Sequence, residues 1–379
     1  MTGRCDSMGF SDGSGYDRSL RAGARACVDD VLGLKKGETL LIITNPNQEV
    51  REISMAIFDA AEGAGASPVV AFQREKGQFD FTEESIVAAM RAEPDAILSM
   101  SADRLGKDRV GLQNGYKGKR KYSDYFELLY EEKKSRAFWS PGITKDMFRR
   151  TVPIDYTRLR SDCRRLVRLL AASSEARVTA PGGTDVRIGV KGRKARPDDG
   201  DFRRPGASGN VPSGEVYVSP ALGTAQGVIA FDGSMVLNEG EVVIRTPIVA
   251  EVSGGFITAI SGKSEAERLK ASIASARSKT RKMVSQGLLP RKSLESYSRN
   301  ASSIGELGIG LNRRARIVAN MLEDEKVYGT CHFAVGSNYD GDAEALIHLD
   351  GIVKRPTITL VSPSGRETVV MESGKLTWD

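Results

Sequence analysis

The alternation of strands and helices in the first half of the chain limits its possible folds most strongly. Short apolar runs suited to buried strands alternate there with stretches of helical periodicity: 39–44, 49–64, 68–72, 83–92 and 96–100. A helix over 125–133 and a strand over 136–140 continue the series. Such alternation is typical of a parallel sheet flanked by helices, so we predict an α/β N-terminal domain.

The pattern changes after a basic amphipathic helix predicted over residues 156–174. Strand-like runs then dominate, and one long helix over 263–286 interrupts them. With 379 residues the chain is long enough for two domains. We predict an α/β domain over 17–175 and a β-rich α+β domain over 176–379, preceded by a disordered tail over 1–16 that is polar and rich in Gly and Ser.

The N-terminus and the cysteines predict a cytoplasmic protein. The first residues contain no apolar stretch of the kind found in signal peptides, and no run approaches the roughly 18 apolar residues of a membrane span. The four cysteines are far apart and form no Cys-x-x-Cys pair: Cys5, Cys27, Cys163 and Cys331. This spacing favours reduced thiols over a disulfide framework or a thiolate zinc site, and no membrane partner is expected.

The net charge of +6 gives little information on function. Basic residues cluster at 117–121 and 277–282, and such clusters are usually solvated surface. A non-catalytic protein that binds polyanions through these segments is one possible function class. Aromatic residues are not interleaved with the basic ones, however, so nucleic acid is not the expected partner.

The histidine count restricts the chemistry further. The chain has only two histidines, His332 and His348, which are sixteen positions apart. Any histidine chemistry is therefore confined to one short stretch, and any metal site must take most of its ligands from carboxylates. Zinc fingers and sites with three histidines are excluded.

The residues around the second histidine suggest metal ligands. In a strand, His348 and Asp350 would face the same side, and an imidazole beside a carboxylate binds divalent cations well. The same pair also occurs as a simple hydrogen bond in protein cores. Glu215 and Glu306 each follow a glycine and precede an apolar run, where a glutamate either faces a site or faces solvent.

Taken together, these residues form a typical ligand set for two metal ions that share a bridging carboxylate and a water molecule. The candidate ligands are Glu215, Glu306, His332, His348 and Asp350, and Glu306 is the candidate bridge. Tyr339 either binds a metal, hydrogen-bonds a developing oxyanion, or packs on the surface of the sheet.

Other catalytic patterns are missing or weak. No Gly-x-Ser-x-Gly elbow follows a predicted strand, and the sequence has no His-Glu-x-x-His helix, no Walker A loop, and no Gly-x-Gly-x-x-Gly after the first strand. Cys331 stands next to His332, but neighbours in a strand point to opposite faces, which argues against a thiol–imidazole pair.

Four motifs resemble those of the aminopeptidase T group of metallopeptidases over residues 19–360. They are Asn-x-Pro-x-x-Glu-Val, Gly-Glu-Leu-Gly-Ile-Gly, Glu-Asp-Glu-Lys-Val-x-Gly-Thr-x-His and His-Leu-Asp-Gly. The resemblance implies an α/β N-terminal domain, a homodimer, and a dinuclear site on the five candidate ligands with Tyr339 nearby. It thus predicts an aminopeptidase with Glu306 and Tyr339 as catalytic residues, in which two divalent ions (Zn, Co, Mg or Mn) activate water to attack peptides.

The sequence also resembles the 2,5-dihydroxypyridine dioxygenases, which are mononuclear iron enzymes. Their two histidines and one carboxylate would fall on His332, His348 and Asp350. The alternative prediction is therefore one Fe(II) and the ring cleavage of hydroxylated N-heterocycles, with a small-molecule substrate in place of a peptide. The segment between the histidines is short for a peptidase and carries Asp340-Gly341-Asp342 where a glycine-rich loop is expected.

Overall fold

The apolar runs of the first half form a five-stranded parallel sheet, as the alternation predicts. The computed structural model describes residues 15–77 and 80–379. The strand order is β10-β6-β3-β1-β2, with bounds β1 (Thr39–Thr44), β2 (Ser67–Phe72), β3 (Ala96–Ser101), β6 (Arg136–Pro141) and β10 (Ser208–Asn210). The interior strands β1 and β3 are buried almost from end to end, which explains why their sequences are apolar without alternation.

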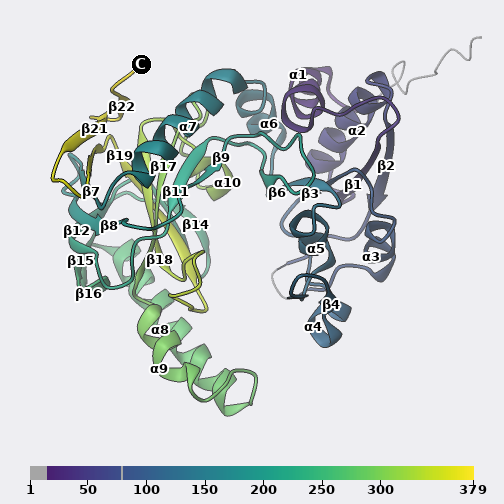
Figure 1. The fold of residues 1–379 in the computed structure, drawn as a ribbon. Helices are drawn as coiled ribbons and strands as arrows, with labels where there is room; N and C mark the ends of the chain where they lie inside the picture. Colours follow the sequence, from purple (N-terminus) through teal and green to yellow (C-terminus); the bar gives the residue numbers. More distant parts are fainter. Residues whose placement is uncertain (1–14, 78–79) are drawn as a thin grey trace, which may run out of the picture. The chain divides into compact units, whose positions relative to one another are not determined.

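Helices cover this sheet in two groups. α1, α2 and α6 contact one another, α3 and α5 contact each other, and the two groups lie on opposite sides of the strands (Figure 1). The helical segments and the small hairpin of this part are η2 (Arg18–Leu20), α1 (Arg21–Arg25), η3 (Ala26–Leu32), α2 (Gln48–Gly63), α3 (Glu84–Met90), α4 (Arg109–Asn114), β4 (Tyr116–Lys117), β5 (Lys121–Tyr122), α5 (Tyr125–Glu131) and α6 (Lys145–Thr151).

The chain divides into two units, and one of them is discontinuous in sequence. Unit 1 comprises residues 1–157 and 200–213, and unit 2 comprises 158–199 and 214–379. The edge strand β10 thus returns to the sheet of unit 1 after part of unit 2 has been built, and it pairs in parallel with β6.

Unit 2 contains two antiparallel sheets. The seven-stranded sheet has the order β14-β13-β19-β18-β17-β11-β9, and the eight-stranded sheet has the order β16-β15-β12-β8-β7-β20-β21-β22. Their bounds are β7 (Glu175–Thr179), β8 (Asp185–Gly189), β9 (Arg196–Asp198), β11 (Glu215–Val218), β12 (Gln226–Phe231), β13 (Ser234–Leu237), β14 (Gly240–Val243), β15 (Ile248–Ser253), β16 (Phe256–Ser261), β17 (Ile304–Gly310), β18 (Thr330–Gly336), β19 (His348–Lys354), β20 (Thr357–Val361), β21 (Glu367–Glu372) and β22 (Lys375–Leu376).

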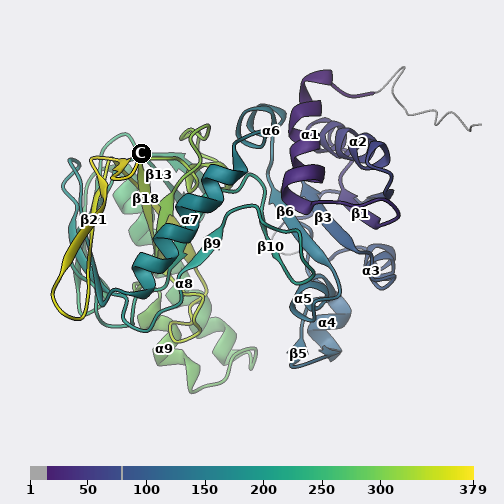
Figure 2. The ribbon, with the colours of Figure 1, turned by 45° about the horizontal axis from the view of Figure 1, so that its top comes forward.

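Close packing joins the two sheets of unit 2. A Cβ atom on Gly351 of β19 would lie 2.4 Å from the Phe231 ring of β12, so only glycine allows this approach. Four helices complete the unit, and α8 packs against α9. They are α7 (Tyr156–Ala171), α8 (Ser264–Ser285), α9 (Ser293–Asn300) and α10 (Met321–Asp324), and Figure 2 shows α7 lying alongside β9.

The helix α7 corrects the predicted domain boundary. The predicted boundary places residues 156–174 in the first domain, but from residue 158 onward the chain belongs to unit 2. The thiol of Cys163 approaches the Glu215 carbonyl oxygen at 3.7 Å, and Asp162 accepts a hydrogen bond from the Trp378 indole at 2.9 Å. These contacts with distant parts of the chain place the helix in unit 2, and no local sequence pattern predicts them.

The predicted tail also ends too late. Residues 1–14 lie outside the described residues, but Tyr16 is buried and donates a hydrogen bond from its hydroxyl to Asp59 at 2.7 Å. The cysteines within the described part, Cys27, Cys163 and Cys331, are buried free thiols, whereas Cys5 falls outside it. Among the described residues, no helix combines the length and the apolar character needed to cross a membrane.

Candidate metal centre

Four neighbouring strands of the seven-stranded sheet carry the candidate ligands. Glu215 begins β11, Glu306 lies in β17, His332 lies in β18, and β19 contains His348 and Asp350. These strands are adjacent in the order β19-β18-β17-β11 (Figure 1). The fold therefore gathers in one sheet residues from four separate stretches of the sequence.

The register places these side chains on one face of the sheet. Ala334 of β18 pairs with Glu306 on one side and with Asp350 on the other, and paired residues of antiparallel strands share a face. His332 and His348 stand two positions away from these residues on their own strands, so they point the same way. The sequence predicts that His348 and Asp350 of β19 face the same side, and the candidate ligands on the neighbouring strands share that side.

A glycine makes room for the first histidine. Gly308 lies opposite both Tyr217 and His332, and Glu215 is two positions from Tyr217, so Glu215 shares their face. A Cβ atom on Gly308 would lie 2.0 Å from Cε1 of His332. The imidazole therefore occupies the space that a side chain at position 308 would need.

Glu306 lies between the two histidines. Its Oε1 is 3.0 Å from Nε2 of His332, and its Oε2 is 3.6 Å from Nε2 of His348. Glu215 completes the first half of the cluster, with Oε2 3.5 Å from the His332 Nε2. Asp350 completes the second half, with Oδ1 3.3 Å from the His348 Nε2.

The cluster fits a metal ion. One ligand atom each from Glu215, Glu306 and His332 lie within 4.8 Å of one another, and all three residues are buried. Oε2 of Glu215, Oε2 of Glu306 and Oδ1 of Asp350 are buried without a hydrogen-bond donor among the described residues. Buried carboxylate oxygens without donors are costly unless a cation neutralises them, so this donor set suits a hard or borderline divalent cation.

The backbone orients the second histidine. Nδ1 of His348 lies 2.8 Å from the carbonyl oxygen of Ser337, to which it donates its hydrogen. This bond leaves Nε2 directed at Glu306 and Asp350, which is the arrangement that metal-binding histidines commonly have.

A buried lysine borders the cluster. Nζ of Lys326 lies 2.6 Å from Oε1 of Glu215, 2.5 Å from Oε1 of Glu325 and 3.3 Å from Oδ2 of Asp198, and its side chain is fully buried. No local sequence pattern identifies these residues as neighbours of the candidate ligands. Glu325 and Lys326 belong to the Glu-Asp-Glu-Lys motif, whereas Asp198 reaches the site only through its pairing with Glu215.

The electrostatics of the cluster couple both histidines to the carboxylates. Burial opposes the charge on His332, but the contacts with Glu306 and Glu215 outweigh it and raise the pKa of His332 to about 9. Burial is likewise outweighed at His348, where Asp350 and Glu306 raise the pKa to about 10. Burial alone would raise the pKa of Asp350, but the histidines, His348 above all, lower it to about 2.

The carboxylates around the lysine respond differently. Burial raises the pKa of Glu325 to about 8 and that of Asp198 to about 7, despite the neighbouring ammonium group. Burial lowers the pKa of Lys326, but Glu215 and Glu325 more than compensate and hold it well above its usual range. The lysine is thus a permanent positive charge beside the candidate centre.

Tyr339 lies beside the second histidine. Its ring centroid is 5.1 Å from that of His348 and 5.4 Å from that of Tyr217, and its backbone N–H donates to the Ser219 hydroxyl at 3.3 Å. The side chain is 57 % exposed. Tyr339 therefore borders the cluster from the solvent side, and its catalytic role stays a prediction.

Two arginines hold the loop that carries this tyrosine. Arg193 contacts Asp340 at 3.2 Å and Asp342 at 2.5 Å, and Arg196 contacts Asp340 at 2.7 Å. The Asp-Gly-Asp segment that departs from a glycine-rich loop thus forms ion pairs that tie the loop to the segment around β9.

The remaining sequence features lie away from the cluster. Cys331 is buried on the opposite face of β18 from His332, which agrees with the argument against a thiol–imidazole pair. In the basic segments, Arg120 pairs with Glu127 and Arg277 donates to backbone and side-chain oxygens of α9 and the residues after it. Part of their charge therefore serves internal contacts.

The fold and the ligand set define a two-unit protein with a buried carboxylate–histidine centre in its antiparallel sheet. This chain belongs to the 2,5-dihydroxypyridine 5,6-dioxygenase (NicX) family, whose model matches residues 144–377. The matched region is more than half of the chain and contains all five candidate ligands. Comparison with curated proteins finds no match.

Two solved structures share the fold over nearly the whole chain. The 2,5-dihydroxypyridine dioxygenase from Pseudomonas putida KT2440 is 17 % identical, with a TM-score of 0.68 over 95 % of this chain and 97 % of that one. AmpT from Thermus thermophilus is 16 % identical, with a TM-score of 0.63 over 95 % and 99 %. These likenesses confirm the predicted fold class.

Proposed function

We propose that this protein is a metal-dependent aminopeptidase whose centre holds two divalent cations. The observation that carries the proposal is the position of Glu306, whose two carboxylate oxygens face different histidines. A carboxylate placed in this way suits a bridge between two cations. Glu215 and His332 would hold one cation, and His348 and Asp350 would hold the other.

The charge of the cluster is compatible with two cations. Five carboxyl groups and one ammonium group meet there: Asp198, Glu215, Glu306, Glu325, Asp350 and Lys326. If all five carboxyl groups ionise, one lysine and two divalent ions balance them. With one divalent ion, charge balance needs two protonated carboxyl groups, and the raised pKa values of Glu325 and Asp198 make these two the candidates, so metal content has to decide between one ion and two.

The chain's own residues would then position and protonate the substrate. Bound divalent ions would supply Lewis-acid activation of the peptide carbonyl and of water. Glu306 fixes the separation of the two histidines, and the Ser337 carbonyl fixes the direction of the His348 Nε2. Tyr339, whose ring lies beside His348, would donate its hydroxyl hydrogen to an oxyanion at the edge of the centre.

The family match favours a second candidate, a ring-cleaving dioxygenase with one Fe(II). His332, His348 and Asp350 would be the iron ligands, and Glu215 with its lysine partner would remain outside the coordination sphere. The rings of Tyr217 and Tyr339 form an aromatic surface next to His348 that suits a planar heterocyclic substrate.

Metal content and turnover together decide between the two candidates. Protein purified without chelator should contain two divalent ions per chain and, after loading with cobalt, zinc or manganese, should hydrolyse Leu-p-nitroanilide. His348→Ala should abolish this activity, whereas Cys331→Ala, on the opposite face of a neighbouring strand, should retain it. One iron per chain together with oxygen uptake on 2,5-dihydroxypyridine would refute the aminopeptidase and establish the dioxygenase.

A further inference from the structure

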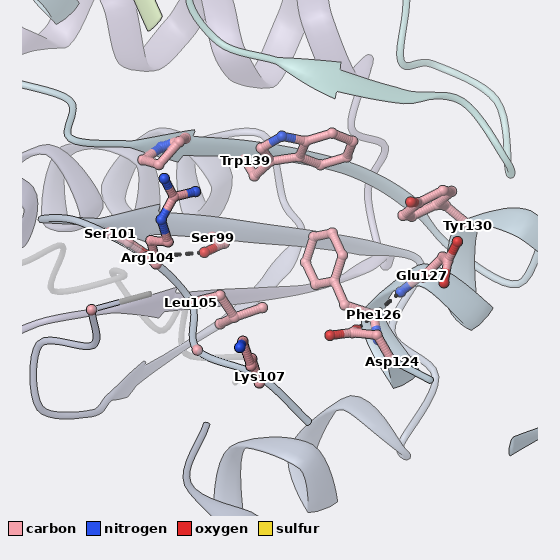
Figure 3. A pocket seen from close by; sticks show the side chains of 13 residues that line it. Ser99, Ser101, Arg104, Leu105, Lys107, Asp124, Phe126, Glu127, Tyr130 and Trp139 are labelled. Carbon is pink, nitrogen blue, oxygen red and sulfur yellow. Dashed lines mark hydrogen bonds between the residues drawn. The ribbon is translucent and has the colours of Figure 1, made fainter. Parts of the chain in front are cut away.

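We propose that unit 1 contains a binding site for a planar aromatic carboxylate, separate from the metal centre in its residues. The site is a cavity of about 450 Å³ whose lining belongs entirely to unit 1 (Figure 3). This volume lies in the range of small-molecule sites. Residues at the carboxyl ends of β3 and β6 line it, and ligands of parallel α/β sheets bind at that edge.

Aromatic rings supply a stacking surface. Trp139 of β6 and Tyr130 of α5 are stacked, with centroids 5.8 Å apart and planes inclined by 29°. Phe126 meets the same indole edge to face at 6.1 Å. Figure 3 shows the Phe126 ring between the serines of β3 and Tyr130, so a flat ring has aromatic partners in the cavity.

Two buried hydroxyl groups supply a hydrogen-bond donor. Ser99 and Ser101 alternate on β3, both are at least 97 % buried, and their Oγ atoms are 2.9 Å apart. The pair has two hydroxyl hydrogens, and their mutual bond uses one of them. Within the described part of the chain the other hydrogen is available to an acceptor in the cavity that both residues line, and a buried hydroxyl needs such a partner.

Charge is distributed unevenly along the lining. Arg104 and Lys107 contribute positive charge, and in the view of Figure 3 Arg104 lies at the Ser101 end of the cavity, away from Tyr130. Asp124 and Glu127 contribute negative charge at the α5 end, and Asp124 itself accepts the first N–H groups of that helix. The helix N-terminus is therefore already occupied by a carboxylate, and an anionic ligand group is directed to the arginine and the serine pair.

These features together define the ligand. An aromatic ring would stack near Trp139, and a carboxylate would accept hydrogen bonds from Arg104 and from the serine pair. The planar guanidinium group of arginine matches the geometry of a carboxylate. Among the described residues, the glycines that line the cavity are Gly77 and Gly106, and they do not form a glycine-rich phosphate loop, so a carboxylate fits better than a nucleotide.

Calorimetric titration of the full-length protein with three probes tests the proposal. 2-Naphthoate should bind at one site per chain with a Kd below about 1 mM. Its neutral amide lacks the charge and cyclohexanecarboxylate lacks the aromatic ring, so each should bind at least tenfold more weakly, since a charged hydrogen bond and ring stacking each contribute about that factor.

Matched variants locate the binding. Arg104→Gln, at an exposed position that does not threaten folding, should weaken 2-naphthoate about tenfold and leave the amide unchanged. Arg51→Gln, an exposed charge change on α2 outside the cavity lining, should leave both affinities unchanged. Ser99→Ala should weaken 2-naphthoate as well.

The metal centre supplies the remaining control. Treatment with EDTA and the His348→Ala variant should leave 2-naphthoate binding unchanged, because no metal-centre candidate lines the cavity. Loss of binding in either case would assign the probe to the metal centre and overturn the proposal. Equal affinity of Arg104→Gln and the unaltered protein, or no saturable binding of any probe up to about 10 mM, would overturn it too.

Discussion

Metal binding to this protein should depend steeply on pH. With pKa values of about 9 and 10, the side chains of His332 and His348 are both positively charged imidazolium groups at pH 7 in the metal-free protein. A histidine binds a metal only through a nitrogen that has lost its proton, so binding must displace both protons. Raising the pH removes this competition and should therefore strengthen binding.

The size of the effect follows from the pKa values. At pH 7, displacing a proton held with a pKa of about 9 costs roughly 2.7 kcal/mol, and one held with a pKa of about 10 costs roughly 4.1 kcal/mol. The apparent affinity at pH 7 should thus be about 10⁵-fold below its value above both pKa values. Between pH 7 and 8 the affinity should rise about 100-fold, whereas histidines with ordinary pKa values would give almost no change there.

Competition with a chromophoric chelator measures this dependence. The affinity for zinc or manganese is determined from pH 6.5 to 8, after correction for protonation of the chelator itself. Calorimetry at pH 7 in two buffers of different ionisation enthalpy then counts the protons released, with at least two per chain expected. His348→Gln should lower the slope of log affinity against pH from about two to about one, and Cys331→Ala should not change it. A slope below one in the unaltered protein would refute the coupling between the histidines and the carboxylates.

Three substitutions should separate the roles of neighbouring residues. Gly308→Ala should force the His332 ring aside, reduce metal content, and cost about 1–3 kcal/mol in chemical unfolding, and full metal content would contradict the packing argument. Lys326→Met leaves buried carboxylates without their cation, so it should lower the unfolding free energy of the metal-free protein by about 3–5 kcal/mol at pH 8. An added divalent cation should then raise the unfolding free energy of this variant by more than it raises that of the unaltered protein. Asp340→Asn should loosen the loop beside the centre and lower kcat/KM about fivefold to tenfold with unchanged metal content, because a misplaced positioning group costs rate without removing ligands; a loss of metal would show that the loop serves the ligands instead.

Much of the candidate centre could be predicted because its candidate ligands follow local rules. Alternation along one strand places His348 and Asp350 on the same face, and the low histidine count identifies His332 and His348 as the possible imidazole ligands. The five candidate ligands lie in one sheet. The contribution of Lys326 could not be derived in this way, because a buried ammonium is recognisable only from the carboxylates that surround it in space.

The parallel sheet of unit 1 was predictable for the same reason, since its strands are continuous apolar runs. The domain boundary and β10 were not, because both depend on pairings between distant segments. β10 (Ser208–Asn210) is three residues long, contains a glycine, and shows no strand pattern of its own. β10 is a strand only because it pairs with the backbone of β6, and this pairing leaves no periodic pattern in the sequence.

The return of β10 to the sheet of unit 1 has a consequence for the order of folding during synthesis. A ribosome that has finished residue 157 has made every other strand of that sheet, but it must still make residues 158–199 before the edge strand emerges. Until then the outer edge of β6 has unpaired backbone groups, which attract strands from other chains. Unit 1 therefore matures only after a piece of unit 2 has left the ribosome, and a fragment that ends at residue 157 should aggregate where a fragment that ends beyond 213 does not.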